Sequence, residues 1–321
     1  MKEFSTEVEA ANSLAGAYEQ LRAEIGKVVV GQDETVRLML TSIFCEGHSL
    51  LVGVPGLAKT LLVQTLSNVL DLSFNRIQFT PDLMPSDILG AETLDKERNF
   101  KFIKGPIFAN IILADEINRT PPKTQAALLE AMQEKSVTVA GEKHAIPTPF
   151  FVLATQNPIE QEGTYPLPEA QLDRFMFNII LDYPSLQHEI DIVKNTTGVD
   201  PATVKHILSG EDIRAYQQLV RKVPAVDNVV EYAVKLVHKT RPGKEGATDF
   251  TNQYLEWGAG PRASQYLILG AKCNALLNGK YSPDIEDVKA VAKPILRHRI
   301  VRNFKAEAQG ITVDQAIEEL L

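Results

Sequence analysis

Residues 53–60 read Gly53-Val54-Pro55-Gly56-Leu57-Ala58-Lys59-Thr60. An apolar run at 49–52 precedes them and an apolar segment beginning at Leu61 follows, which predicts a strand, a glycine-bearing turn and a helix. The backbone N–H groups of such a turn and the N-terminus of the following helix both present positive potential to an anion. This stretch, the phosphate loop below, therefore predicts a phosphate-binding site.

The loop and Leu61 after it are expected to contact a nucleotide. Lys59 would reach the β- and γ-phosphates, and the hydroxyl of Thr60 would bind Mg²⁺. Ala58 stands where the usual pattern has its second glycine. Because a residue with a Cβ rarely adopts a positive φ, we expect Gly53 or Gly56 to carry the left-handed turn. Taken alone, the octapeptide also fits an ordinary connection between a strand and a helix.

A second signal is an apolar run at 111–114 that ends in Asp115-Glu116. Such runs are typical of buried parallel strands, and two adjacent carboxylates at a strand end cost free energy unless they have partners. Asp115 suits Mg²⁺ binding, and Glu116 suits activation of an attacking water. The acids could instead face solvent before a helix that begins near Thr120-Pro121. With the phosphate loop upstream, nucleotide hydrolysis explains the pair better.

Composition limits the alternatives. The 321 residues suffice for a nucleotide domain and a smaller second domain. A net charge of -8 weighs against nucleic-acid binding by the chain as a whole. No stretch has the ~18 apolar residues of a membrane span, and residues 1–4 carry charge where a secretory signal is apolar, so we expect a cytoplasmic protein without membrane insertion. Cys45 and Cys273 lie far apart, which predicts no zinc site.

The order of predicted elements indicates the fold class. Predicted strands occupy 49–52, 74–79, 111–114, 150–155 and 177–181, and helices alternate with them. Alternation of this kind predicts an α/β domain with a parallel sheet flanked by helices. Predicted helices at 215–222, 229–240, 263–277 and 285–299 then follow without strands. We therefore expect a nucleotide-binding core over residues 1–184, including N-terminal helices at 7–25 and 33–46, and a smaller all-α lid domain over 185–321.

Two hairpins are predicted to interrupt the α/β alternation. The first would pair 92–94 with 100–103 around a polar turn, and the second would pair 136–139 with 144–146 around 141–143. Each could be a surface feature without a role. Because they flank the strand that ends in the acid pair, they could also transmit the nucleotide state to something outside the core.

Longer stretches extend the pattern of the loop and the acid pair. They are residues 76–90, beginning Arg-Ile-Gln-Phe-Thr-Pro; 105–110; 113–119; 155–175, with Thr-Gln-Asn-Pro and Leu-Asp-Arg-Phe; 258–264; and 296–300. With these motifs the chain resembles the MoxR family of AAA+ ATPases, in the branch with an extra hairpin inside the second core helix. The resemblance covers the chain from about Val28 to its C-terminus, and alanine at position 58 is usual in that family.

The resemblance implies roles for further residues. Asn157 matches the sensor-1 position, which orients water or touches the γ-phosphate, and Arg174 matches the arginine finger that reaches a neighbouring subunit's nucleotide. Arg262 matches sensor 2, which contacts the nucleotide. Val30 and Gly31 fall where the family packs adenine.

Simpler interpretations remain for these residues. Asn157 could form only an Asn-Pro turn, and Val30 could be ordinary core packing. Arg174 could be an exposed side chain paired with Glu169 or Asp173. Gly260-Pro261 looks like a helix start, so Arg262 would lie in a first turn. Because the helix dipole disfavours a cation there, a phosphate partner would compensate.

The resemblance implies a ring-forming chaperone-like ATPase, expected as a hexamer, that uses ATP and Mg²⁺ to remodel a client protein. It further implies help in maturation or metal-cofactor insertion, beside a partner with a von Willebrand factor A domain. Two alternatives stay open, which are a nucleic-acid ring motor and a nucleotide-gated binding platform with little turnover. A basic run, Arg297-His298-Arg299 with Arg302 and Lys305, is interpreted as a solvated helix face or a subunit contact rather than a nucleic-acid site.

Overall fold

The computed structural model describes residues 6–94, 99–160, 162–198 and 202–321. At its centre is a five-stranded sheet with the order β2-β5-β8-β1-β9, in which all neighbouring strands run parallel. The strands are β1 (Ser49–Gly53), β2 (Phe74–Gln78), β5 (Ile111–Asp115), β8 (Phe151–Gln156) and β9 (Phe177–Leu181). The predicted parallel sheet is therefore confirmed, and its carboxyl ends share one edge.

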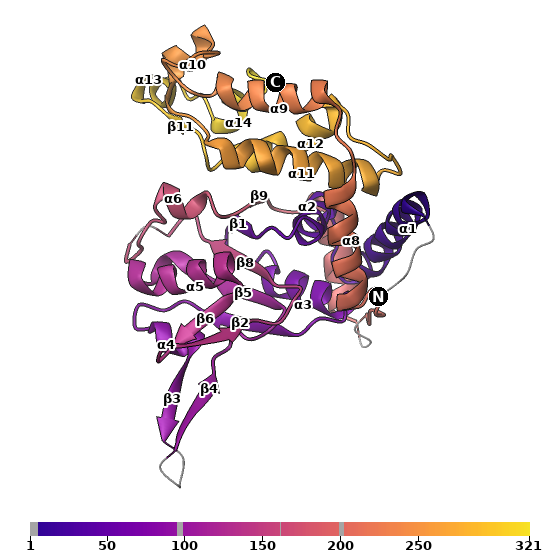
Figure 1. The fold of residues 1–321 in the computed structure, drawn as a ribbon, viewed down its shortest axis with the longest axis vertical. Helices are drawn as coiled ribbons and strands as arrows, with labels where there is room; N and C mark the ends of the chain where they lie inside the picture. The colour runs from indigo at the N-terminus through magenta and orange to yellow at the C-terminus, as the bar shows by residue number, and fades with distance from the viewer. Residues whose placement is uncertain (1–5, 95–98, 161, 199–201) are drawn as a thin grey trace.

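Helices cover both faces of this sheet (Figure 1). Leu51, Leu113 and Leu153 belong to one buried cluster with α1 (Glu7–Ile25), α2 (Asp33–Phe44) and α3 (Lys59–Val69). Leu50, Ile112 and Val152 belong to the other cluster, with α4 (Pro85–Leu89) and α5 (Pro122–Glu134). Successive strand residues point to opposite faces, so a run that is apolar at every position fills both clusters. A short 3₁₀ turn, η1 (Ile117–Arg119), and α6 (Glu169–Leu172) complete this part.

Both predicted hairpins are present as two-stranded antiparallel ladders. The first pairs β3 (Gly90–Leu94) with β4 (Phe100–Lys104) and projects from the sheet layer (Figure 1). Residues 95–98, which form most of its predicted turn, lie outside the described residues, as does the N-terminus at 1–5.

The second hairpin pairs β6 (Ser136–Val139) with β7 (Glu142–Ala145). Its turn is formed by Ala140 and Gly141, both at positive φ (49° and 88°), rather than by 141–143 as predicted. Two-residue turns of this kind match the right-handed twist of the strands, which explains why the strand resumes at Glu142.

An aromatic stack joins the two hairpins. The rings of Phe102 on β4 and His144 on β7 lie parallel with centroids 4.0 Å apart. Phe102 also meets the edge of Phe108 at 5.7 Å. The hairpins therefore contact each other through side chains, although they come from separate parts of the chain.

The remainder of the chain is mainly helical, and residues 227–321 lie above the sheet in Figure 1. Its helices are α7 (Leu186–Thr196), α8 (Gly210–Lys222), α9 (Asp227–Lys239), α10 (Asp249–Tyr254), α11 (Pro261–Leu277), α12 (Ile285–Leu296), α13 (Phe304–Ala308) and α14 (Val313–Glu318). A short ladder of β10 (Leu255–Trp257) and β11 (Val301–Arg302) was not predicted, because strands of this length show no measurable periodicity.

Helix α8 lies along the α/β core rather than away from it (Figure 1). Gln217 on this helix donates to the carbonyl of Ile43 at 2.8 Å, and the hydroxyls of Tyr216 and Ser13 lie 2.9 Å apart. The domain boundary at 184/185 stays a prediction. Within the described ranges, no helix is both long and apolar enough to cross a membrane.

Two glycines lead to opposite expectations for stability. Gly105, at the base of the first hairpin, leaves no space for a Cβ, which would lie 2.3 Å from the backbone oxygen of Ile88. Gly16 is exposed in α1, and nothing lies within 4 Å of its added Cβ. We expect Gly105→Ala to lower the melting temperature, and Gly16→Ala to raise the free energy of unfolding by roughly 0.5–1 kcal/mol. Thermal unfolding followed by circular dichroism checks both, and equal melting temperatures for the two variants would contradict the described backbone at Gly105.

Candidate functional site

The phosphate loop and the acid pair line one cavity. It has a volume of about 300 Å³ and lies at the carboxyl ends of the central strands. Its lining residues are Pro55, Gly56, Leu57, Ala58, Lys59, Thr60, Asp115, Glu116 and Asn157. Parallel strands bring these residues together, because the residue after each strand falls at the same edge.

The backbone of the loop differs from our expectation at Ala58. Gly56 is left-handed (φ 87°) as predicted, but Ala58 is left-handed as well (φ 53°). The expectation that only glycine carries the turn was therefore wrong. Ala58 is the N-cap of α3, and the strand and helix that anchor the loop fix its dihedral angles. Gly53 is needed for close packing rather than for the turn. A Cβ added at this position would lie 2.7 Å from the Cβ of Leu181 on the neighbouring strand.

Lys59 is held over the phosphate loop. Its ammonium donates a hydrogen bond to the carbonyl of Gly53. Burial lowers the pKa of Lys59, and the nearby carboxylates of Asp115 and Glu116 oppose that shift. A cation and two carboxylates thus share a partly desolvated space, where charges interact more strongly than in water.

The carboxylate of Asp115 is fixed on both oxygens. Oδ1 accepts from the Thr155 hydroxyl at 2.7 Å, and Oδ2 accepts from Arg76 at 2.5 and 3.1 Å. The same Thr155 oxygen accepts from the backbone N–H of Glu116 at 2.8 Å. With a side chain only 14% exposed, Asp115 has a defined position at the edge of the cavity.

Glu116 is held in an unusual backbone conformation. Its φ of 58° is left-handed, and it is the N-cap of η1. Its Oε2 accepts from Gln78 at 2.8 Å and pairs with Arg119 at 3.0 Å. A strained residue held by two donors beside a cavity suggests a functional role, because its neighbours must maintain the conformation.

Asn157 lines the same cavity and also forms a local turn. Its Oδ1 accepts from the backbone N–H of Ile159 at 3.2 Å, and its Nδ2 donates to Glu160 at 3.4 Å. The simpler Asn-Pro turn and a position at the cavity therefore occur together.

The oxygen donors at the cavity fit Mg²⁺. Thr60 offers a hydroxyl and Asp115 a carboxylate. Mg²⁺ in phosphate-transfer sites takes one or two protein oxygens and completes its coordination with phosphates and water. In the described part of the chain no three His, Cys, Asp or Glu residues gather as a metal cluster, so the protein would supply few of the ligands.

Six of the predicted nucleotide contacts do not line this cavity. They are Val30, Gly31, Gly53, Val54, Leu61 and Arg262. The segment that carries Val30 and Gly31 is nevertheless tied to the phosphate loop, because Gln32 Nε2 donates to the carbonyl of Leu57 at 3.3 Å.

Arg174 and Arg262 lie together, away from the phosphate loop of their own chain. Both line a second cavity of about 230 Å³, with Lys135, Arg221 and Glu46. Over the described residues the Arg174 guanidinium has no ion pair, so the suggested pairing with Glu169 or Asp173 is not formed.

Arg262 has a carboxylate partner within the chain. It lies in the first turn of α11, as predicted, and its Nη1 contacts Asp173 Oδ2 at 2.9 Å. The Asp173 carboxylate compensates for the unfavourable dipole at this helix end. Its role in nucleotide binding stays a prediction.

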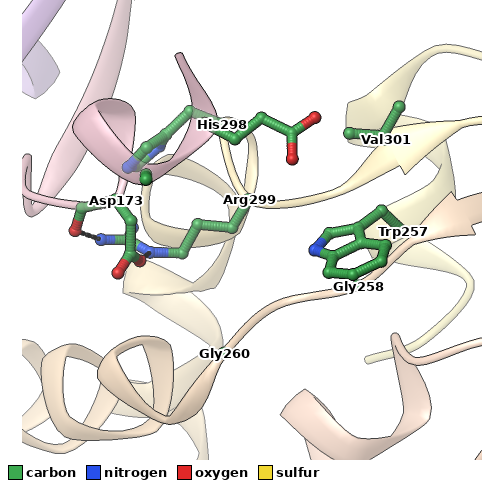
Figure 2. Close-up of a pocket in the computed structure, with 9 residues that line it drawn as sticks. Asp173, Trp257, Gly258, Gly260, His298, Arg299 and Val301 are labelled. Atoms are coloured by element: carbon green, nitrogen blue, oxygen red, sulfur yellow. Dashed lines mark hydrogen bonds and ion pairs between the residues drawn. The ribbon is translucent and has the colours of Figure 1, made fainter.

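Asp173 also binds Arg299, whose side chain is only 2% exposed (Figure 2). Arg299 Nε donates to Asp173 Oδ1 at 2.8 Å, and Nη2 donates to the carbonyls of Asp173 and Phe175 at 2.9 and 2.7 Å. Burial lowers the pKa of Arg299, and the Asp173 carboxylate opposes this. Figure 2 shows this pair on one side of a further cavity of about 300 Å³, with Trp257 on the other side.

The basic run was therefore misinterpreted as a solvated face. Arg297 pairs with Asp314 at 2.6 Å and donates to the carbonyl of Asn178 at 2.8 Å. His298 Nε2 donates to the carbonyl of Phe175 at 3.0 Å. These side chains leave α12 toward β9 and the segment before it, because that segment offers carbonyl groups without strand partners.

Comparison with known proteins agrees with this arrangement. Residues 48–177 match the model for the ATPase family associated with various cellular activities (AAA), and residues 248–320 match an AAA lid domain. The chain is 44% identical to Chaperone MoxR1 of Mycobacterium tuberculosis, over 93% of this chain and 79% of that protein. Protein MoxR of Methylorubrum extorquens is 30% identical, over 86% of this chain and 85% of that one.

The chain belongs to the MoxR family of AAA+ ATPases. A crystal structure described as that of a candidate ATPase, from Cytophaga hutchinsonii, superposes with a TM-score of 0.91 at 44% identity. The match covers 97% of this chain and 95% of that one. The α/β core and helical lid predicted from the sequence are thus confirmed.

Several residues of this MoxR-family site were not found from the sequence. Thr155, Arg76 and Arg119 fix the acid pair, and Asp173 and Arg299 join the lid to the segment that carries Arg174. Of these residues, only Asp173 could have been suspected from the sequence, because it lies directly before Arg174. The sequence does not indicate the pairing of Arg299 with Asp173, because the two residues lie 126 positions apart.

We expect Arg299→Met to destabilise the protein by about 1–3 kcal/mol, because it leaves the carbonyl acceptors of the buried guanidinium unpaired, while the partly exposed Asp173 keeps Arg262 as a partner. Arg214→Met, at an exposed arginine on α8, is the matched control and should change stability by less than about 0.5 kcal/mol. Thermal or urea unfolding of the full chain checks both. Equal stability of the two variants would contradict the role of Arg299 as the link between lid and core.

Proposed function

We propose that this MoxR-family protein binds ATP in the cavity at the phosphate loop and hydrolyses it to ADP and phosphate. The observation that carries the proposal is that Lys59, Asp115 and Glu116 share one cavity with the loop amides. Backbone N–H groups and an ammonium suit the phosphates, and a carboxylate base suits the water that attacks the γ-phosphorus.

Each residue then has a defined task. Lys59 stabilises the negative charge on the transferred phosphoryl group, and Glu116 accepts a proton from the attacking water. Asn157 orients that water or the γ-phosphate by hydrogen bonding. Thr60 and Asp115 would hold Mg²⁺, which supplies neutralisation of phosphate charge when bound. Thr155 supports both acids, since its hydroxyl connects the Asp115 carboxylate to the Glu116 backbone.

The second cavity supports a ring. It holds four basic side chains and one acidic one, and Arg174 and Arg262 are among the basic ones. Because this surplus of positive charge suits a triphosphate but lies away from the chain's own phosphate loop, we propose that it receives the nucleotide of a neighbouring subunit. A contact between two different faces of identical chains forms a ring when the rotation between neighbours closes, and we propose a hexamer.

The hairpins are our candidates for contact with a client protein. Leu94 and Phe100 are direct partners across the first hairpin and are 61% and 74% exposed. The stack of Phe102 on His144 links this hairpin to the second one, which follows α5. Movement of either could therefore be passed to the other. Client maturation, metal-cofactor insertion, a von Willebrand factor A partner and a cytoplasmic location are proposed by likeness to the family alone.

Neither a nucleic-acid ring motor nor a nucleotide-gated binding platform gains support from the structure. Burial of Arg299 and the pairing of Arg297 with Asp314 remove the basic run from a nucleic-acid surface. Glu116 and Asp115 both line the cavity, which weighs against a platform that binds ATP without turning it over.

We expect Glu116→Gln to retain ATP binding while hydrolysis falls by about 10²-fold or more, because the amide cannot accept the proton. Phosphate release and the Kd for ATP measure the two effects separately. Glu142→Gln, at an exposed position on the second hairpin, should leave both unchanged. Turnover at the parent rate in Glu116→Gln would refute the assignment of Glu116 as the base.

Arg174→Ala should lower turnover by roughly 10³–10⁵-fold while each subunit still binds nucleotide, because a charge at the transferring phosphoryl group is lost. In rings mixed with wild-type subunits, activity should fall at the sites next to the variant. The exposed Arg214 on α8 provides the control, as Arg214→Ala. A loss confined to the variant subunits' own sites would contradict action across the interface.

A further inference from the structure

The order of the strands fixes the direction in which a nucleotide lies. Strand β1, which leads into the phosphate loop, lies between β8 and β9. Asp115, Glu116 and Asn157 follow β5 and β8, so the γ-phosphate belongs on that flank. The nucleoside must therefore extend toward the β9 flank.

Two segments meet on the β9 flank. Gly53 pairs with Leu181 at the end of β9, and residues 182–185 lead from there into α7. His188 lies in the first turn of α7, where its backbone N–H donates to the Ser185 hydroxyl at 3.3 Å. The second segment is the loop before α2, which includes Gly31.

His188 packs directly on Gly31. A Cβ at Gly31 would lie 2.3 Å from His188 Nδ1 and 2.6 Å from its Cγ. Gly31 also has a φ of 74°, which a residue with a side chain adopts only with strain. Gln32 fixes this loop against the phosphate loop through the carbonyl of Leu57. The contact between imidazole and glycine backbone thus lies beside the phosphate cavity.

We propose that His188 forms a wall of the base pocket and packs its ring against the purine of the bound nucleotide. The ring is half-buried and, within the described ranges, its nitrogens make no hydrogen bond, so the protein leaves their hydrogen-bonding capacity to a ligand or to solvent. Gly31 lies directly against the ring, where a side chain would collide with the imidazole. This assignment rests on the proposed function, because it takes ATP as the ligand of the adjoining phosphate cavity.

The test separates binding of the base from binding of the phosphates. In the full chain, His188→Ala should raise the Kd for ATP and for ADP by roughly five- to 150-fold, the loss expected when a stacking ring is removed. The Kd for inorganic tripolyphosphate, which has no base, should stay unchanged. His188→Phe should restore most of the ATP affinity, because it keeps an aromatic face.

His206→Ala is the matched control. The His206 ring bonds to the carbonyl of Asn68 at 2.6 Å, at the opposite end of α3 from the phosphate loop, so its removal should change neither Kd. Gly31→Ala should weaken ATP binding. The double variant Gly31→Ala/His188→Ala should lose less ATP affinity than the sum of the two single losses, because the collision between the new methyl group and the imidazole is removed.

Three results would overturn the inference. Unchanged ATP affinity in His188→Ala would show that His188 does not contact the base. Equal loss of ATP and tripolyphosphate binding makes His188 a support of the phosphate loop instead. If the wild-type chain bound tripolyphosphate but neither ATP nor ADP, the proposed ATPase function would fail together with the base pocket.

Discussion

The common edge of a parallel sheet is the constraint on which this site depends. Because β1, β5 and β8 run in the same direction, the amides and ammonium of the phosphate loop meet the carboxylates of Asp115 and Glu116 in one cavity. Charges in a partly desolvated space interact strongly. The positive groups of the loop therefore attract a triphosphate, and the carboxylates attract the metal cation bound to it. Thr155, Arg76 and Gln78 hold the acids in place, so the chemistry requires little rearrangement of the protein.

A second interaction joins the lid to the core. Asp173 binds Arg299 from the end of α12 and Arg262 from the start of α11, and the next residue is Arg174. The Tyr266 hydroxyl also contacts the carbonyl of Arg174 at 3.4 Å. A shift of the lid would therefore move the segment that carries the proposed arginine finger. In the proposed ring, this geometry gives a physical route by which one subunit's nucleotide could influence its neighbour, since packed elements shift as units.

The nucleotide would thus contact residues that come from separate segments of the chain. The acids lie on the β5 and β8 flank, and Gly31 and His188 lie on the β9 flank. The cluster around Asp173 connects the lid, while the hairpins joined by Phe102 and His144 project from the opposite part of the core (Figure 1). The relative positions of these parts determine which groups can reach a bound triphosphate.

The sequence by itself determined the five strands of the sheet, most of the longer helices and the phosphate loop and acid pair of the cavity, because each of these carries local signals of periodicity and turn chemistry. It misjudged Ala58, whose left-handed φ depends on the elements that anchor the loop, and Arg297 to Arg299, whose partners lie far away in the chain. Only the tertiary structure decided that Asp173 binds two arginines and that His188 lies on Gly31. Such contacts join distant segments, and neither composition nor spacing records which side chains will meet across them.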